Sequence, residues 1–132
     1  MNKYVSILSI VLLLLVGCKE EMITGEVTAE LEPKTIMNGE TATFTVNLKN
    51  TGKIAANVFL EIIPEDKSKL QVIYPGELEQ PLQSGEEMTK IIRLRGFTDY
   101  TSTKYWVKVR LVEKVSGTVL DEEEHIVTVR KQ

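Results

Sequence analysis

Apolar and polar residues alternate along most of this chain after residue 25. In the clearest stretch, residues 41–49, Ala42, Phe44, Val46 and Leu48 alternate with threonine, asparagine and lysine. Successive side chains of a β-strand point to opposite faces, so this alternation predicts a strand with one face in the core. The same period predicts further strands over residues 26–32, 54–63, 70–74, 88–95, 104–113 and 119–130.

Glycine and asparagine separate these stretches. Asn38-Gly39, Asn50-Thr51-Gly52 and Ser84-Gly85-Glu86 are typical of turns. Residues 78–82 are expected to cross between sheets, and the last strand to be interrupted or bulged near the acidic residues 121–124. No long helical period follows the leader, so the pattern predicts an all-β fold, a two-sheet antiparallel β-sandwich of about seven strands.

The first 17 residues have the layout of a helical signal peptide. Lys3 gives a positive start, residues 4–16 form an apolar run, and Gly17 precedes Cys18. A membrane-spanning helix needs about 20 apolar residues, and charged residues follow this run at once. The run therefore predicts an export signal.

Leu15-Val16-Gly17-Cys18 resembles the lipobox of lipoproteins. The resemblance implies a diacylglyceryl group on the sulfur of Cys18 and cleavage before this residue. The expected organisation is a signal peptide over residues 1–17, a lipidated cysteine and linker over 18–25, and a sandwich over 26–132. The expected location is the extracytoplasmic face of a membrane, periplasmic or at the cell surface. An ordinary secretory signal with a chance cysteine, or an uncleaved short anchor, remain the alternatives.

Charge and cysteine content further limit the partners and the stabilising bonds that the chain can have. The chain has 16 Lys and Arg against 19 Asp and Glu, a formal net charge of −3. Nucleic-acid binding asks for a clustered basic face, so no nucleic-acid partner is expected. One cysteine allows no internal disulfide, so the apolar core alone must hold the domain together.

From Asn38 onward the chain resembles the CARDB-like group of immunoglobulin-like domains on bacterial and archaeal surface proteins. Four motifs carry the resemblance: Asn38-Gly39-Glu40-Thr41, the stretch from Val46 to Gly52, the stretch from Leu82 to Glu86, and Tyr105-Trp106-Val107-Lys108-Val109. Tyr105 occupies the position of the tyrosine corner in such domains. The resemblance implies an immunoglobulin-like sandwich used for binding, spacing or adhesion, and it brings no catalytic residue.

The residues also offer little for catalysis or metal binding. His125 is the only histidine, and alternation places it on the core side of the last strand or at the rim of the core. No recognisable motif pairs it with a nucleophile. The acids of residues 121–124 point to alternate faces of a strand, so they cannot converge on calcium. We therefore expect no enzyme activity, no cofactor and no metal.

A partner surface is the remaining candidate. In an immunoglobulin-like order the strands over 54–63, 104–113 and 119–130 share a sheet, and their outward side chains give an apolar centre with a basic margin. The expected function is a non-catalytic, lipid-anchored module that binds a protein or cell-envelope partner, with an accessory subunit of a membrane transport or secretion complex as the alternative. The face comprises Phe59, Ile63, Trp106, Lys108, Arg110 and Ile126.

Overall fold

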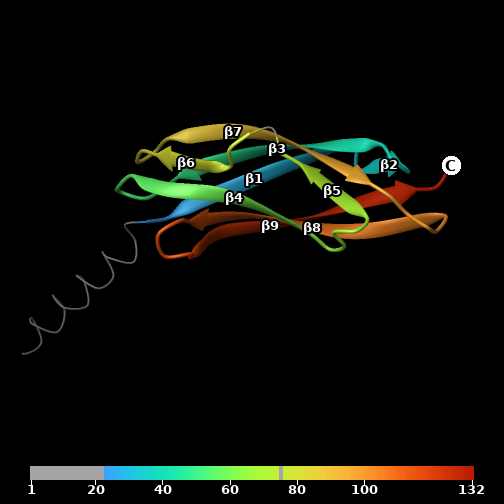
Figure 1. Cartoon of the computed structure of the whole chain (residues 1–132). Coiled ribbons are helices and arrows are strands. Elements are labelled where there is room, and N and C mark those ends of the chain that lie inside the picture. Colours follow the sequence, from blue (N-terminus) through green and yellow to red (C-terminus); the bar gives the residue numbers. More distant parts are fainter. Residues whose placement is uncertain (1–22, 75) are drawn as a thin grey trace, which may run out of the picture.

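The computed structural model describes residues 23–74 and 76–132, which form nine β-strands and no helix. The predicted signal peptide and Cys18 lie outside the described residues. The strands run side by side along the length of an elongated body, with the chain entering at one end and the C-terminus at the other (Figure 1). They are β1 (Gly25–Glu32), β2 (Thr35–Met37), β3 (Thr41–Asn50), β4 (Ala56–Pro64), β5 (Leu70–Ile73), β6 (Glu79–Leu82), β7 (Glu87–Gly96), β8 (Ser102–Glu113) and β9 (Val119–Arg130).

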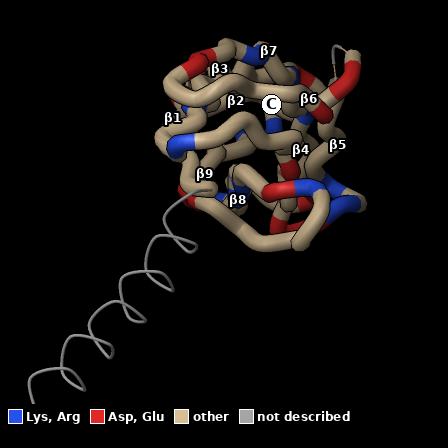
Figure 2. Tube along the Cα trace, turned by 90° about the vertical axis from the view of Figure 1, so that its left-hand side faces the viewer, with Lys and Arg blue, Asp and Glu red and all other residues tan. Residues whose placement is uncertain are grey.

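These strands form two sheets that pack face to face. One has the order β1-β3-β7-β5 and the other the order β2-β9-β8-β4-β6. Viewed from the end at which the chain enters, β1, β3 and β7 lie in one layer, and β9, β8 and β4 in the other (Figure 2). Paired strands are antiparallel except β2, which runs parallel to β9. The all-β, two-sheet prediction is confirmed, and the strands predicted to share a sheet do so.

The inner faces of the two sheets form one apolar core. Ala42, Phe44, Val46 and Leu48 of β3 are all fully buried, as their alternation predicts. Each large apolar side chain removed from water contributes about 1.5–3 kcal/mol, which offsets the ordering of the chain. The opposite sheet supplies Val58, Leu60, Ile62, Tyr105, Val107, Val109, Leu111, Val127 and Val129 to the same cluster.

Two of the nine strands were not predicted, β2 and β6. β2 is only three residues long and follows Pro33 closely, yet it places Ile36 in the core. β6 contains Pro81, a residue that sheets accept only at edges, and β6 is an edge strand. β5 pairs with β7 in one sheet and β6 with β4 in the other, so the chain crosses between sheets just before β6. The expected crossing over residues 78–82 was therefore placed too late, because residues 79–82 are β6 itself.

The turns are fastened to neighbouring strands by hydrogen bonds. The side-chain oxygen of Asn38 accepts a bond from the backbone N–H of Thr98 at 2.9 Å. The N–H of Gly39 donates to the carbonyl of Gly96 at 2.8 Å. Gly39 has φ of +85°, a conformation that a Cβ would strain. The turn between β2 and β3 is therefore fixed to the end of β7.

Asn50 joins two turns at the opposite end of the sandwich. Its buried carboxamide donates to the carbonyls of Ile54 at 2.9 Å and Leu82 at 3.0 Å. Its side-chain oxygen accepts from the N–H of Gly52, and its backbone carbonyl accepts from the N–H of Gly85. A buried amide with all these partners stabilises the arrangement of both turns.

The hydroxyl of Tyr105 links the start of β8 to the loop after β7. The ring is buried in the core, and the hydroxyl donates to the backbone carbonyl of Phe97 at 2.9 Å. This is the contact expected of a tyrosine corner.

One sheet edge is closed by acidic side chains. β1 lies beside β9 of the other sheet, where the backbone N–H of Val27 donates to Asp121 at 2.8 Å and that of Ala29 donates to Glu123 at 3.1 Å. Without these acceptors, both N–H groups of the edge strand would need other partners. We call these two contacts the carboxylate seam.

The predicted irregularity of the last strand is a β-bulge immediately before this seam. Leu111 pairs with Asp121, but the next residue of β8, Val112, pairs with Val119. Leu120 is therefore an extra residue on β9. A bulge of this kind bends the strand, and here it precedes the two acids that face β1.

Replacement of Asp121 by alanine is expected to lower the free energy of unfolding by about 1–3 kcal/mol, because the N–H of Val27 loses its acceptor. The control is Glu124→Ala, which removes an exposed carboxylate from the same strand and is expected to change stability by less than about 0.5 kcal/mol. Urea denaturation measures both. Equal losses in the two variants would contradict a stabilising role for the seam.

The hairpin between β8 and β9 is held by Glu113. Its carboxylate accepts the backbone N–H of Ser116 at 2.6 Å and the hydroxyl of the same residue at 2.5 Å. The hydroxyl bond, followed by the backbone bond, holds the pKa of Glu113 below its ordinary value. The ionised form of this side chain therefore stabilises the hairpin.

Glu113→Gln should make stability less dependent on pH in the acid range. The pKa of Glu113 is lower in the folded state, so its contribution is complete above the ordinary value of 4.5 and is lost as the pH falls through the folded-state value. Urea midpoints measured from neutral to acid pH should fall less steeply in the variant. Glu40→Gln, at an exposed turn, is the control and should keep the parental slope.

Candidate functional site

All six residues of the predicted partner surface lie on one face, the outer face of the five-stranded sheet. Each alternates along its strand with a buried core residue, so their side chains point away from the core. Ile126 is 48% exposed, and the other five are partly buried. The sequence prediction had therefore assembled residues that the fold does place together. We call this surface the β4-β8-β9 face.

The centre of the β4-β8-β9 face is charged. Arg110 is paired across the sheet with Glu61 on one side and Glu122 on the other. Its guanidinium lies 2.6 Å from the carboxylate of Glu122 and 3.8 Å from that of Glu61, and Lys108 lies 3.8 Å from Glu122. The predicted apolar centre with a basic margin is thus replaced by a central row of paired charges.

One apolar group lies beyond this charged row, toward the C-terminal end of β4. Trp106 is directly opposite Ile126, and Ile63 is opposite Lys108. The ammonium of Lys108 lies 5.2 Å from the centre of the Trp106 ring, a cation–π contact. The lysine is therefore shared between the indole and the carboxylate of Glu122.

A second apolar group lies on the other side of the charged row. Phe59 pairs with Val112, and Val112 pairs with Val119. Directly opposed side chains on one face of a sheet are in contact distance, so these three make a continuous apolar row. The face therefore alternates apolar, charged and apolar along the strand direction.

Tyr74, which follows β5, was not part of the predicted face. Its side chain is 45% exposed. Partial burial, and then the nearby carboxylate of Glu61, raise the pKa of its hydroxyl. Alternation within β4, β8 and β9 could not find Tyr74, because it lies outside the strands that form the β4-β8-β9 face.

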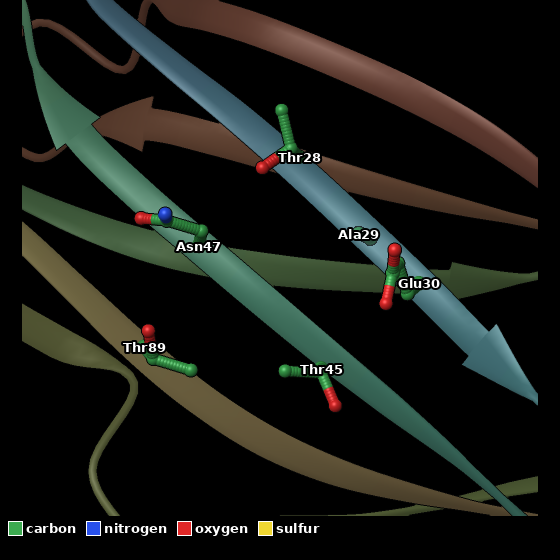
Figure 3. Close-up of a pocket in the computed structure, with 6 residues that line it drawn as sticks. All are labelled: Thr28, Ala29, Glu30, Thr45, Asn47 and Thr89. Carbon is green, nitrogen blue, oxygen red and sulfur yellow. The ribbon is translucent and has the colours of Figure 1, made fainter.

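The outer face of the other sheet carries a shallow polar hollow of about 290 Å³. Thr28, Asn47 and Thr89 form a row across β1, β3 and β7, with Thr45 next to it along β3 (Figure 3). The side-chain oxygen of Asn47 is buried and has no hydrogen-bond partner among the described residues. Sequence alternation predicted the outward direction of these side chains but not the hollow.

His125 lies at the rim of the core, in agreement with its predicted position. Its ring packs edge-on against Phe44 with the ring centres 5.4 Å apart, and Nε2 lies 3.0 Å from the carboxylate of Glu123. A second hollow of about 240 Å³ opens beside it, lined by Ala29, Glu30, Leu31, Glu32 and Lys34 together with His125. These contacts of the histidine are those of a packed side chain.

The acidic run of β9 divides between two directions, as predicted. Asp121 and Glu123 bind the backbone of β1, whereas Glu122 binds Arg110 on the outer face. Within residues 23–74 and 76–132, no group of three or more histidine, cysteine, aspartate or glutamate side chains is placed to hold a metal ion. In the same part of the chain, no helix is long and apolar enough to cross a membrane.

No family model matches the sequence, and comparison with curated proteins gives no significant match. Among solved structures, the chain is similar to the FixG-related protein of Vibrio parahaemolyticus, with 11% identity and a TM-score of 0.56 over 82% of this chain and 96% of that chain. It is also similar to the CARDB domain of the PF1109 protein of Pyrococcus furiosus, solved in complex with di-metal ions. That likeness has 16% identity and a TM-score of 0.55 over 81% of this chain and 86% of that chain.

A third likeness is to native alpha-2-macroglobulin of Escherichia coli, with 16% identity and a TM-score of 0.58. It covers 85% of this chain but 17% of that chain, so the likeness is to a small part of a larger protein. At these identities the comparisons establish the fold alone. The described part of the chain is an immunoglobulin-like β-sandwich with a CARDB domain among its structural neighbours.

Proposed function

We propose that this protein is a lipid-anchored, extracytoplasmic module whose immunoglobulin-like domain binds a protein or cell-envelope partner without catalysis. The lipobox-like residues before Cys18 support the anchor. The immunoglobulin-like fold supports a binding role, because such domains commonly present one sheet face or one set of loops to partners. Its place is the membrane surface facing the periplasm or the cell exterior.

The observation that carries the binding role is the composition of the β4-β8-β9 face. Trp106, Ile126 and Ile63 lie next to a row of charges that are already paired within the domain. Tryptophan and arginine are common energetic centres of protein interfaces. Because Arg110 is held by two carboxylates before any partner arrives, the face is preorganised and little ordering is needed on binding.

The alternative is an accessory subunit of a membrane transport or secretion complex. The distance between the anchor and the fold favours it, since β1 begins at Gly25 and the cysteine is Cys18. This linker spans at most about 25 Å when fully extended. A domain held so near the bilayer reaches the extracytoplasmic parts of membrane proteins more readily than distant partners.

The anchor is tested at Cys18. Cells given an alkyne-bearing fatty acid should incorporate it into the parent protein, and the parent should sediment with membranes. The Cys18→Ala variant should lose the label and no longer behave as an acylated membrane protein. Label in the variant, or a free thiol at Cys18 in the mature parent, would contradict lipid anchoring.

The face is tested by placing a photo-crosslinking amino acid at Ile126 or at Ile91. Both side chains are about half exposed, at 48% and 54%, but they lie on the outer faces of different sheets. Crosslinking in intact cells should give a discrete adduct from position 126, which Trp106→Ala should weaken several-fold because it removes an aromatic centre of the interface. Adducts from position 91 alone would assign binding to the other face.

A further inference from the structure

The chain enters the sandwich at the end that carries three connecting turns. Thr24 contacts the turn after β3, where its carbonyl accepts the N–H of Thr51 and the two hydroxyls lie 2.8 Å apart. The turn between β6 and β7 and the hairpin between β8 and β9 lie at the same end (Figure 1). We call this end, formed by residues 23–25, 51–55, 83–86 and 114–118, the entry end.

The entry end exposes apolar side chains. Val115, at the tip of the hairpin, is 88% exposed, the highest value among the large apolar residues exposed in the described chain. Val119 at the base of the hairpin is 44% exposed, and Ile54 in the turn after β3 is 39% exposed. An exposed apolar tip costs hydration free energy unless something covers it.

The hairpin holds this tip in place. Glu113 binds both the N–H and the hydroxyl of Ser116, and the N–H of Glu113 donates to the carbonyl of Thr118 at 2.9 Å. The next residue, Lys114, donates its backbone N–H to Asn57 at 2.9 Å. Bonds on both sides of Val115 keep its side chain directed outward and away from the core.

Several charges near the tip are paired within the domain, although Lys53 of the entry end is exposed and makes no ion pair with the described residues. The ammonium of Lys114 pairs with the carboxylate of Glu79, and Lys49 lies 3.6 Å from Glu87. The carboxylate of Glu113 is taken up by Ser116. Apart from Lys53, an approaching apolar surface therefore meets few bare charges that would have to lose their water.

The proposed anchor decides what covers this end. Six residues lie between Cys18 and Gly25, so the two are at most about 25 Å apart, and β1 starts at the entry end. The opposite end also exposes aromatic residues, Phe97 and Tyr100, but it lies a full strand length farther from the entry point (Figure 1). Under the proposed anchor, the entry end is the part of the sandwich nearest the membrane.

We propose that the entry end docks on the lipid surface, with Val115 inserted at the boundary between headgroups and acyl chains and with Val119 and Ile54 beside it. This inference rests on the proposed lipid anchor and adds an orientation to it. Apolar tips of this kind add to an acyl anchor because membrane affinity grows with the apolar area buried. The strands then stand upright on the membrane, and the β4-β8-β9 face is perpendicular to the bilayer surface and open to partners at its side.

The experiment uses the full, lipidated protein in vesicles of phosphatidylethanolamine and phosphatidylglycerol. Because acylation occupies Cys18, Val115→Cys introduces the one free thiol, to which a fluorophore sensitive to polarity is attached. Tyr100→Cys is the matched control, since Tyr100 is 73% exposed at the far end. The label at position 115 should shift its emission to the blue and be quenched by lipids carrying a nitroxide on the acyl chain.

Equal, water-like emission from both positions, in protein that sediments with the vesicles, would overturn the orientation and leave the anchor intact. Quenching at position 100 alone would overturn it as well, by showing the opposite end at the lipid. Protein that stays in the supernatant without an acyl group would overturn the anchor and, with it, this inference. A Val115→Asp variant gives a second reading: it should still sediment through its acyl chains, while a label at Val119→Cys loses its quenching.

Discussion

Two carboxylates of β9 join the edges of the two sheets by accepting hydrogen bonds from the backbone of β1. β1 pairs with β3 in one sheet, and β2 pairs with β9 in the other. β1 is therefore left beside β9 without a backbone hydrogen-bond partner on that side. Asp121 and Glu123 supply the missing acceptors. With one cysteine in the chain and no internal disulfide, this seam and the packing of the two inner faces hold the sheets together. If all the acids of residues 121–124 lay on one face, their negative charges would repel one another. The two-residue period of β9 divides them between its two faces.

Much of the fold follows from period two, because one buried face imposes alternation on every long strand. β3, β4 and β8 show this: the residues assigned inward by alternation are those that form the core. β2 and β6 were not predicted because each is short and lies at a sheet edge near a proline. Local propensity opposes a strand at such positions, and tertiary packing determines that one forms. The bulge at Leu120 was expected only as a region, since the local sequence does not state which residue lacks a cross-strand partner.

The sequence predicted which residues share the β4-β8-β9 face, but it did not predict how their charges pair. Alternation places Trp106, Lys108 and Arg110 outward, and an immunoglobulin-like order brings them beside β4 and β9. Register then decides which charges meet, and register depends on the turns and on the bulge. Glu61 is a polar residue between the apolar Phe59 and Ile63 on the outer face of β4, and its pairing with Arg110 explains it. The surroundings of Tyr74 and the hollow around Asn47 depend on residues that only the fold brings together, so the alternation of the sequence could not predict them.

The position of Gly25 also has a mechanical consequence. The chain enters at the first residue of β1, and β1 runs from there toward the far end, paired with β3 along all eight of its residues. Under the proposed anchor at Cys18, tension toward a load at the far end of the sandwich acts along the axis of β1. It strains the whole ladder to β3 and both seam contacts at once, in shear, instead of opening them one after another. A strand loaded in shear opposes the force with all of its ladder bonds together, whereas a strand peeled from its end opposes it one bond at a time.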